Sequence, residues 1–208
     1  MIFLVIILVL FLYRAFSILP NKSRKPKRLS VGKNSCSIAV FLGSGGHTNE
    51  ALLLISALDV DRYGPRTYIV SSGDDLSVQK AIKFESQISE GNKSNYYMLS
   101  IPRARRVHQS LLTVPASTAY SFIYCVYCLA FRPLFDPNTP GYPDVLLLNG
   151  PGTCFVLCLA VYVNKFLGLH APLIIYIETF ARVKSLSLSA KLIRPLADRS
   201  VGFVLKAI

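Results

Sequence analysis

A glycine-rich segment with one histidine, residues 43–48 (GSGGHT), holds the residue types best suited to binding an anion. Small side chains leave backbone N–H groups open to a phosphate, and the N-terminus of a following helix adds partial positive charge. The His47 imidazole can act as a catalytic base near neutral pH, and a loop histidine without a chemical role is an equal alternative. The residues expected to face the ligand are Ser44, Gly45, Gly46, His47 and Thr48.

Neither of the two common nucleotide-binding glycine loops fits this segment. A Walker loop needs Lys followed by Ser or Thr after its last glycine, where this chain has His47 and Thr48. A dinucleotide loop needs a third glycine at position 48, which is threonine here. A tight turn without a ligand is therefore the alternative to a phosphate site.

A second candidate is the basic segment 102–110 (PRARRVHQS), which follows an apolar, strand-like run. Arg103 and Arg105 carry guanidinium groups, which bind a phosphate through paired, directional hydrogen bonds. The alternative, given equal weight, is a solvated basic loop that lies against anionic lipid.

A third candidate is the turn 149–153 (NGPGT), which precedes a helical pattern. Gly150 and Gly152 permit a positive φ, and Asn149 can donate to a sugar hydroxyl or simply cap the turn. Thr153 begins the helix, whose N-terminus favours negative charge. We expect these four residues to contribute to phosphate or sugar binding.

Glu178 ends the last strand-like run and is the second candidate for proton transfer. A purely structural role, as an acid near a helix N-terminus paired with Arg182, is the favoured interpretation of Glu178. Arg182 is also a candidate phosphate ligand. His108 and His170 have no carboxylate or histidine pattern around them, so we expect neither a metal site nor a cofactor.

Apolar β-type runs that alternate with helical patterns position these segments. The predicted strands are 38–42, 67–71, 96–101, 144–148 and 173–177. One helix is predicted to begin near residue 47, and three others are predicted over 74–88, 110–131 and 153–167. This alternation predicts an α/β fold, a Rossmann-like parallel sheet covered on both faces. The candidate turns would then meet at one edge of the sheet, where ligands bind.

Residues 1–19 predict a transmembrane anchor about 28 Å long as a helix, with Arg14 near one end, where it can reach the lipid headgroups. A cleaved signal peptide would carry its basic residues before the apolar run. Here they follow it, in the basic juxtamembrane linker 20–36. The amino terminus is thus expected on the non-cytosolic side of the membrane, and the domain 37–208 in the cytosol.

The apolar segment 110–131 is long enough for a second span, but a span there would separate the turns at residues 47 and 149. We expect a helix packed on the sheet that can dip into the membrane surface. The sequons at Asn21 and Asn92 would be glycosylated only in the lumen, so they report the topology.

The formal net charge of +12 is consistent with nucleic acid, an anionic membrane or a phosphorylated substrate. No helix-turn-helix, zinc-finger or RRM signature is present, so nucleic acid is the weakest of these. The five cysteines are expected to be small buried hydrophobes in a reducing compartment, although Cys125 and Cys128 have a C-x-x-C spacing.

Four motifs in order, LGSGGHT, IPRAR…QS, NGPGTC and YIETFARVKSLSLSAK, closely resemble the family of membrane-anchoring subunits of the UDP-N-acetylglucosamine transferase of dolichol-linked oligosaccharide assembly. The match covers residues 38–199. The family looks like the amino-terminal half of a GT-B glycosyltransferase, similar to the bacterial MurG enzymes. Two departures are Arg106, where the family often has an acid, and residues 200–208, where it has an aromatic strand and a docking tail.

The resemblance implies a single-pass protein of the endoplasmic reticulum membrane and the contiguous nuclear envelope. It would bind a dolichyl-diphosphate-linked acceptor and recruit a soluble UDP-GlcNAc-binding catalytic subunit to add the second GlcNAc, being inactive alone. Gly45, Gly46 and His47 would face the acceptor diphosphate or sugar. The alternatives are a purely structural receptor without substrate contact and, less favoured, a stand-alone nucleotide-binding or redox enzyme.

Overall fold

The computed structural model describes residues 2–20, 35–88, 95–105, 109–110, 112–136, 139–150, 152–180 and 185–202. Several positions considered above lie outside the described residues: Asn21, Asn92, Arg106, His108 and Arg182. Most of the predicted linker, residues 20–36, lies outside them as well.

Strands and helices alternate from residue 38 onward. The strands are β1 (Ile38–Leu42), β2 (Arg66–Ser71), β3 (Tyr96–Ile101), β4 (Val145–Asn149), β5 (Leu173–Ile177) and β6 (Arg199–Val201). The helices are α1 (Ile2–Ser17), α2 (Gly46–Ser56), α3 (Asp75–Ile88), α4 (Val114–Val126), α5 (Arg132–Phe135), α6 (Thr153–Leu167) and α7 (Leu188–Ile193), and a π-helix, η1 (Tyr127–Phe131), joins α4 to α5.

All six strands are parallel and form one sheet in the order β3-β2-β1-β4-β5-β6. This is the strand order of a Rossmann-like sheet, so the predicted fold class is confirmed. From β1 the chain continues to β2 and β3 on one side of β1, and then crosses over to β4, which pairs with the other side of β1. In such sheets the ligand crevice lies at the carboxyl ends of the two strands where the order reverses, here β1 and β4.

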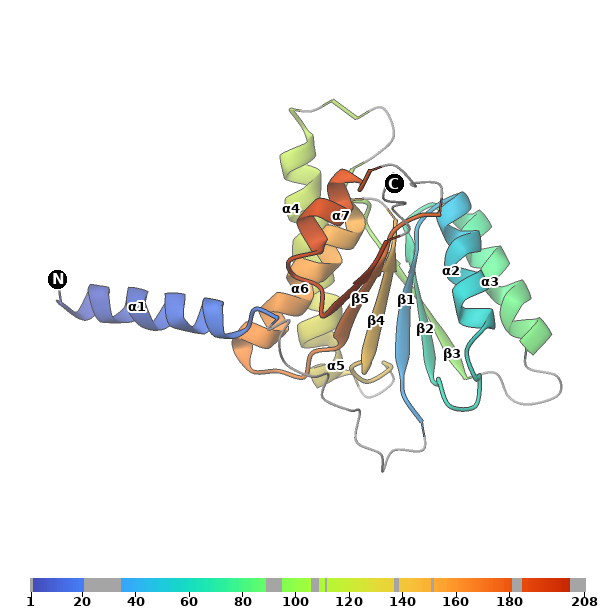
Figure 1. Ribbon diagram of the computed structural model, residues 1–208, viewed down its shortest axis with the longest axis horizontal. Coiled ribbons are helices and arrows are strands. Elements are labelled where there is room, and N and C mark those ends of the chain that lie inside the picture. Colours follow the sequence, from blue (N-terminus) through green and yellow to red (C-terminus); the bar gives the residue numbers. More distant parts are fainter. Residues whose placement is uncertain are drawn as a thin grey trace, which may run out of the picture.

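Helices cover both faces of the sheet (Figure 1). Val40 and Leu42 of β1 belong to the core under α2 and α3, and Ala39 and Phe41 belong to the core under α4, α6 and α7. Successive side chains of a strand point to opposite faces, and both faces here are covered. This is why β1 is apolar at every position rather than alternating.

The five predicted strands are present within one residue of their predicted ends, whereas β6 and α7 were not predicted. The three residues of β6 (RSV) are exposed and lack the apolar signature of a strand. Helix α7 is short, and residues 185–189 (SLSLS), where it begins, have the alternating polar and apolar pattern of a strand. Ser187 starts the helix by accepting a hydrogen bond from Ala190 N.

The segment predicted as one helix over 110–131 is instead α4, η1 and α5 in succession. Cys125 and Ala130 are fully buried on the side that packs against α6. Asn164 of α6 donates to the Leu129 carbonyl of the π-helix at 2.8 Å. Among the described residues, Val114–Phe135 is also the one helical stretch long and apolar enough to cross a membrane. Packing on the domain is confirmed, and entry into the membrane surface remains a prediction.

Helix α1 extends away from the domain (Figure 1), and every residue of it except Ala15 is exposed. Its sixteen residues span about 24 Å. Arg14 is exposed but bonded to the domain. Its guanidinium donates to the carbonyls of Lys165 and Phe166 at 2.8 and 3.2 Å, at the negative end of α6. The transmembrane role of residues 1–19 remains a prediction.

All five cysteines are free and buried, as expected of small hydrophobes. Burial raises the pKa of the Cys158 thiol to about 12 and that of Cys154 further still. These thiols are protonated, and therefore unreactive, at neutral pH.

A buried charged cluster stabilises the sheet edge opposite to the candidate turns. Arg66 makes a bidentate pair with Glu85 of α3 at 2.6 and 2.8 Å, and the two side chains are only 6% and 1% exposed. Tyr68 donates to the same carboxylate at 2.6 Å, and burial together with this bond raises the pKa of its hydroxyl. Glu85 thereby fixes α3 to β2.

We predict that Glu85→Ala lowers the free energy of unfolding of the full chain by about 3–5 kcal/mol, because it leaves the Arg66 guanidinium buried without its partner. The measurement is urea unfolding in detergent micelles. Lys83→Ala, an exposed change on the same helix, is the control and should stay within about 0.5 kcal/mol. Equal effects of the two substitutions would contradict the stabilising role of this cluster.

Candidate anion-binding site

The glycine loop after β1 ends at the N-terminus of α2. Gly45 is the N-cap, with a φ of 69° that favours glycine, and no side chain caps the helix. No atom of the described residues lies within 4 Å of the positions that a Cβ of Gly45 or Gly46 would occupy. The first amides of α2 are therefore open to a ligand, and the first turn contains no acidic residue that would repel an anion.

Thr48 lies beneath this loop. Its side chain is fully buried, and its hydroxyl bonds the Gly43 carbonyl and the Ser77 hydroxyl. The hydroxyl thus holds the loop against α3. Any contact of Thr48 with an anion would come from its backbone N–H.

His47 and Asn149 join the ends of β1 and β4. The His47 Nδ1 atom lies 2.9 Å from Asn149 Oδ1, across the point where the strand order reverses. Asn149 is fully buried, while the His47 side chain is 29% exposed. Asn149 therefore acts on a ligand through His47, and His47 is the member of the pair that a ligand can reach.

Gly150 makes room for the imidazole. Its φ is 122°, and a Cβ there would lie 3.1 Å from His47 Cγ. The turn after β4 thus needs glycine for two reasons, conformation and the close approach of the ring.

Glu50, which the sequence analysis did not single out, connects three strand ends. Its Oε2 accepts from Asn149 Nδ2 at 3.1 Å, and its Oε1 accepts from Thr179 Oγ1 at 2.7 Å and Phe180 N at 3.2 Å. The Oε2 atom also lies 3.9 Å from His47 Nδ1. The only sequence signal was its place three residues after His47, on the same face of a helix.

Residues 102–105 follow β3 and include Arg103 and Arg105; we call them the arginine turn. Hydroxyl groups hold this turn on α4. Ser121 donates to the Pro102 carbonyl at 2.7 Å, and Ser117 and Thr118 both donate to the Ala104 carbonyl. The Ala104 side chain is buried. These bonds fix the backbone of the turn on both sides of Arg103.

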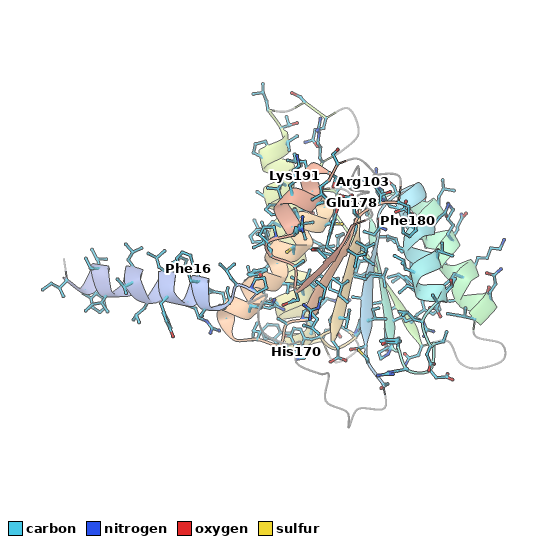
Figure 2. All side chains as sticks on the ribbon, in the orientation of Figure 1. Phe16, Arg103, His170, Glu178, Phe180 and Lys191 are labelled. Atoms are coloured by element: carbon cyan, nitrogen blue, oxygen red, sulfur yellow. The ribbon has the colours of Figure 1, made fainter. Side chains whose placement is uncertain are left out.

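Arg103 and Arg105 flank the buried Ala104, Arg103 half-buried and Arg105 exposed. Within the described ranges, neither guanidinium makes a hydrogen bond or an ion pair. Figure 2 shows Arg103 at the same end of the sheet as Glu178 and Phe180. A half-buried arginine without a protein partner is suited to binding an external anion.

The arginine turn and the turn after β4 are in contact. Thr153, the first residue of α6, is buried and accepts a hydrogen bond from Ala104 N at 3.4 Å. Its N-cap, Gly152, has no side chain to close the helix end. The N-terminus of α6 therefore lies beside the turn that carries the two arginines.

Glu178, unlike the partly exposed His47, is buried and bonded to the protein on both oxygens. Its carboxylate accepts from Ser187 N and Oγ at 2.9 and 3.0 Å and from Thr179 N at 3.2 Å. It anchors the N-terminus of α7, and no bond joins it to His47. A proton-transfer role of Glu178 remains a prediction. The described residues include no cluster of three or more potential metal ligands.

The geometry defines a Rossmann-like α/β protein, and the candidate anion-binding residues lie at the carboxyl ends of β1, β3 and β4. Residues 38–206 match the family model described as "Oligosaccharide biosynthesis protein Alg14 like". The chain therefore belongs to the Alg14-like family, which confirms the resemblance seen in the sequence.

Curated relatives named UDP-N-acetylglucosamine transferase subunit ALG14 are similar in sequence to this chain. The protein of Cryptococcus neoformans is 53% identical over 79% of this chain and 72% of its own. That of Schizosaccharomyces pombe is 43% identical over 78% and 72%. The human protein is 37% identical over 80% and 74%.

We predict that Gly150→Ala destabilises the full chain by about 1–3 kcal/mol, since it forces a side chain into a positive φ and against the imidazole. The His47 ring signals should shift in the NMR spectrum. Gly152→Ala is the matched control, because its φ of −52° is helical and the space around it is open. A glycine-to-alanine change of equal cost at both positions would show that the close approach to His47 is unimportant.

Proposed function

We propose that this chain is the membrane-anchoring, acceptor-binding subunit of a two-component transferase. The complex would add the second GlcNAc to dolichyl-diphospho-GlcNAc on the cytosolic face of the endoplasmic reticulum. One observation supports this most strongly. The open N-terminus of α2, the N-terminus of α6 and Arg103, which has no partner among the described residues, lie at the same edge of the sheet, which includes its topological switch point.

A lipid-linked diphosphate suits this edge in charge. The first backbone N–H groups of a helix have no partner in the preceding turn of the helix and carry partial positive charge, and Arg103 and Arg105 offer guanidinium groups. No acidic side chain stands in the first turn of α2 or α6. The formal net charge of +12 further favours approach to an anionic acceptor at a membrane surface.

His47 is the best candidate for proton transfer within this function. A hydroxyl of the acceptor sugar attacks the anomeric carbon of the donor while UDP leaves, and the hydroxyl proton must go to a base. His47 stands next to the open amides of α2 and is partly exposed. Glu178 is the second candidate, and its carboxylate is already occupied by Ser187.

A second, donor-binding protein is part of this proposal. The sheet and its helices form one Rossmann-like unit, and a GT-B site lies between two such units. The relatives named above are each called a subunit, which fits a donor-binding unit supplied by a second, soluble protein. In this proposal α1 and the basic residues that follow it hold the site near the headgroups.

The test is GlcNAc transfer from UDP-GlcNAc to a lipid diphospho-GlcNAc acceptor, with the purified chain and a soluble donor-binding partner, together and apart. We expect transfer only with both. Arg103→Ala should raise the KM for the acceptor about 10- to 100-fold, because it removes charge-assisted hydrogen bonds to the diphosphate.

Arg62→Ala, an exposed arginine far from the candidate turns, is the control and should leave the KM unchanged. Co-purification of the two proteins is measured in parallel, and Arg103→Ala should not affect it. Transfer by the solitary chain would refute the dependence on a partner. Unchanged turnover in Arg103→Ala and in His47→Ala, with recruitment intact, would favour a purely structural receptor.

A further inference from the structure

We propose that Glu50 is a positioning residue that determines which nitrogen of His47 carries the proton. It does so through the side-chain amide of Asn149, which lies between them. The inference about the proton stands on the hydrogen bonds alone. Its effect on turnover rests on the proposed function, in which His47 accepts the proton of the acceptor hydroxyl.

The first step is the orientation of the Glu50 carboxylate. Thr179 Oγ1 and Phe180 N, both donors, contact its Oε1 at 2.7 and 3.2 Å. The other oxygen, Oε2, faces Asn149 at 3.1 Å. A carboxylate only accepts hydrogen bonds, so the atom of Asn149 at this contact must be the amide nitrogen.

The second step follows from the orientation of Asn149. With its nitrogen on Glu50, its oxygen Oδ1 faces His47 Nδ1 at 2.9 Å. An amide oxygen only accepts, so Nδ1 must carry the proton and donate it. Asn149 is fully buried, and an unpaired polar group there costs about 1–3 kcal/mol, which disfavours the reverse arrangement.

The third step concerns the other ring nitrogen. Because Nδ1 is engaged toward the buried Asn149, Nε2 lies on the opposite side of the ring and keeps a free lone pair. Within the described part of the chain, Nε2 makes no hydrogen bond to the protein. The ring lies so close to Gly150 that a Cβ there would be 3.1 Å from its Cγ. The result is an imidazole whose accessible nitrogen can accept a proton.

Glu50→Gln tests this chain of contacts with almost no change in shape. The Phe180 N–H can only donate to this contact, whereas the Thr179 hydroxyl can donate or accept, so the Gln oxygen is expected to take the place of Oε1 and the Gln nitrogen to face Asn149. The Asn149 amide must then turn over and present its nitrogen to His47 Nδ1. That nitrogen donates, so the imidazole proton must move from Nδ1 to Nε2.

The measurement is the ¹⁵N NMR spectrum of the imidazole nitrogens in the full chain, labelled at histidine and held in detergent micelles at mildly alkaline pH. The chain has three histidines, and the His47→Gln variant identifies the His47 signals. We expect the Nδ1–H tautomer in the wild type and the Nε2–H tautomer in Glu50→Gln.

Two controls should keep the wild-type tautomer. Asp61→Asn removes the same charge from an exposed position. Thr179→Val removes a donor to Glu50 and leaves the contact with Asn149 in place. An Nε2–H tautomer in the wild type, or the same tautomer in wild type and Glu50→Gln, would overturn the proposal.

Transfer kinetics with the soluble partner separate this inference from the function on which it draws. A tautomer switch with a fall in kcat of about 100-fold and a KM within about threefold supports both. A switch with unchanged kcat upholds the positioning by Glu50 and overturns the role of His47 as base. An unchanged tautomer overturns the positioning whatever the kinetics show.

Discussion

The buried side chain of Asn149 is the contact on which the candidate site depends. It lies at the end of β4, accepts from His47 Nδ1 and donates to Glu50, so it fastens the first turn of α2 to the neighbouring strand. Glu50 extends the same connection to the end of β5 through Thr179 and Phe180. A buried amide must satisfy both of its polar atoms, and that requirement fixes three chain segments relative to one another.

This arrangement explains how an acidic residue can stand beneath a site for an anion. The charge of Glu50 is offset by three donors, and its side chain is only 16% exposed. The groups available to a ligand are the open amides of α2, the His47 imidazole, and Arg103 and Arg105, which have no partner among the described residues. The hydroxyls of Ser117, Thr118 and Ser121 hold the arginine turn on α4, and Thr153 joins it to α6. The positive groups are thus carried by a rigid frame rather than by free loops.

Much of this edge could be predicted from the sequence, because apolar runs reveal the strands and glycine turns mark where those strands end. The residues that hold the frame together could not. Glu50 reads as an ordinary helix acid, since its partners lie about a hundred residues away in the chain. Thr48 and Asn149 carry ligand-binding groups, but their burial depends on how α2, α3 and β4 pack. Arg14 likewise meets the carbonyl end of α6 only after the domain has folded.

The most direct test of the account is an NMR titration of the full chain, ¹⁵N-labelled at glycine and histidine, with a short-chain isoprenyl diphospho-GlcNAc. The account predicts saturable shifts of the backbone amides of Gly45, Gly46 and His47, with Gly141 and Gly168 unmoved. Saturable binding that leaves the amides of Gly45 and Gly46 in place would contradict it, because the diphosphate would then bind elsewhere on the chain.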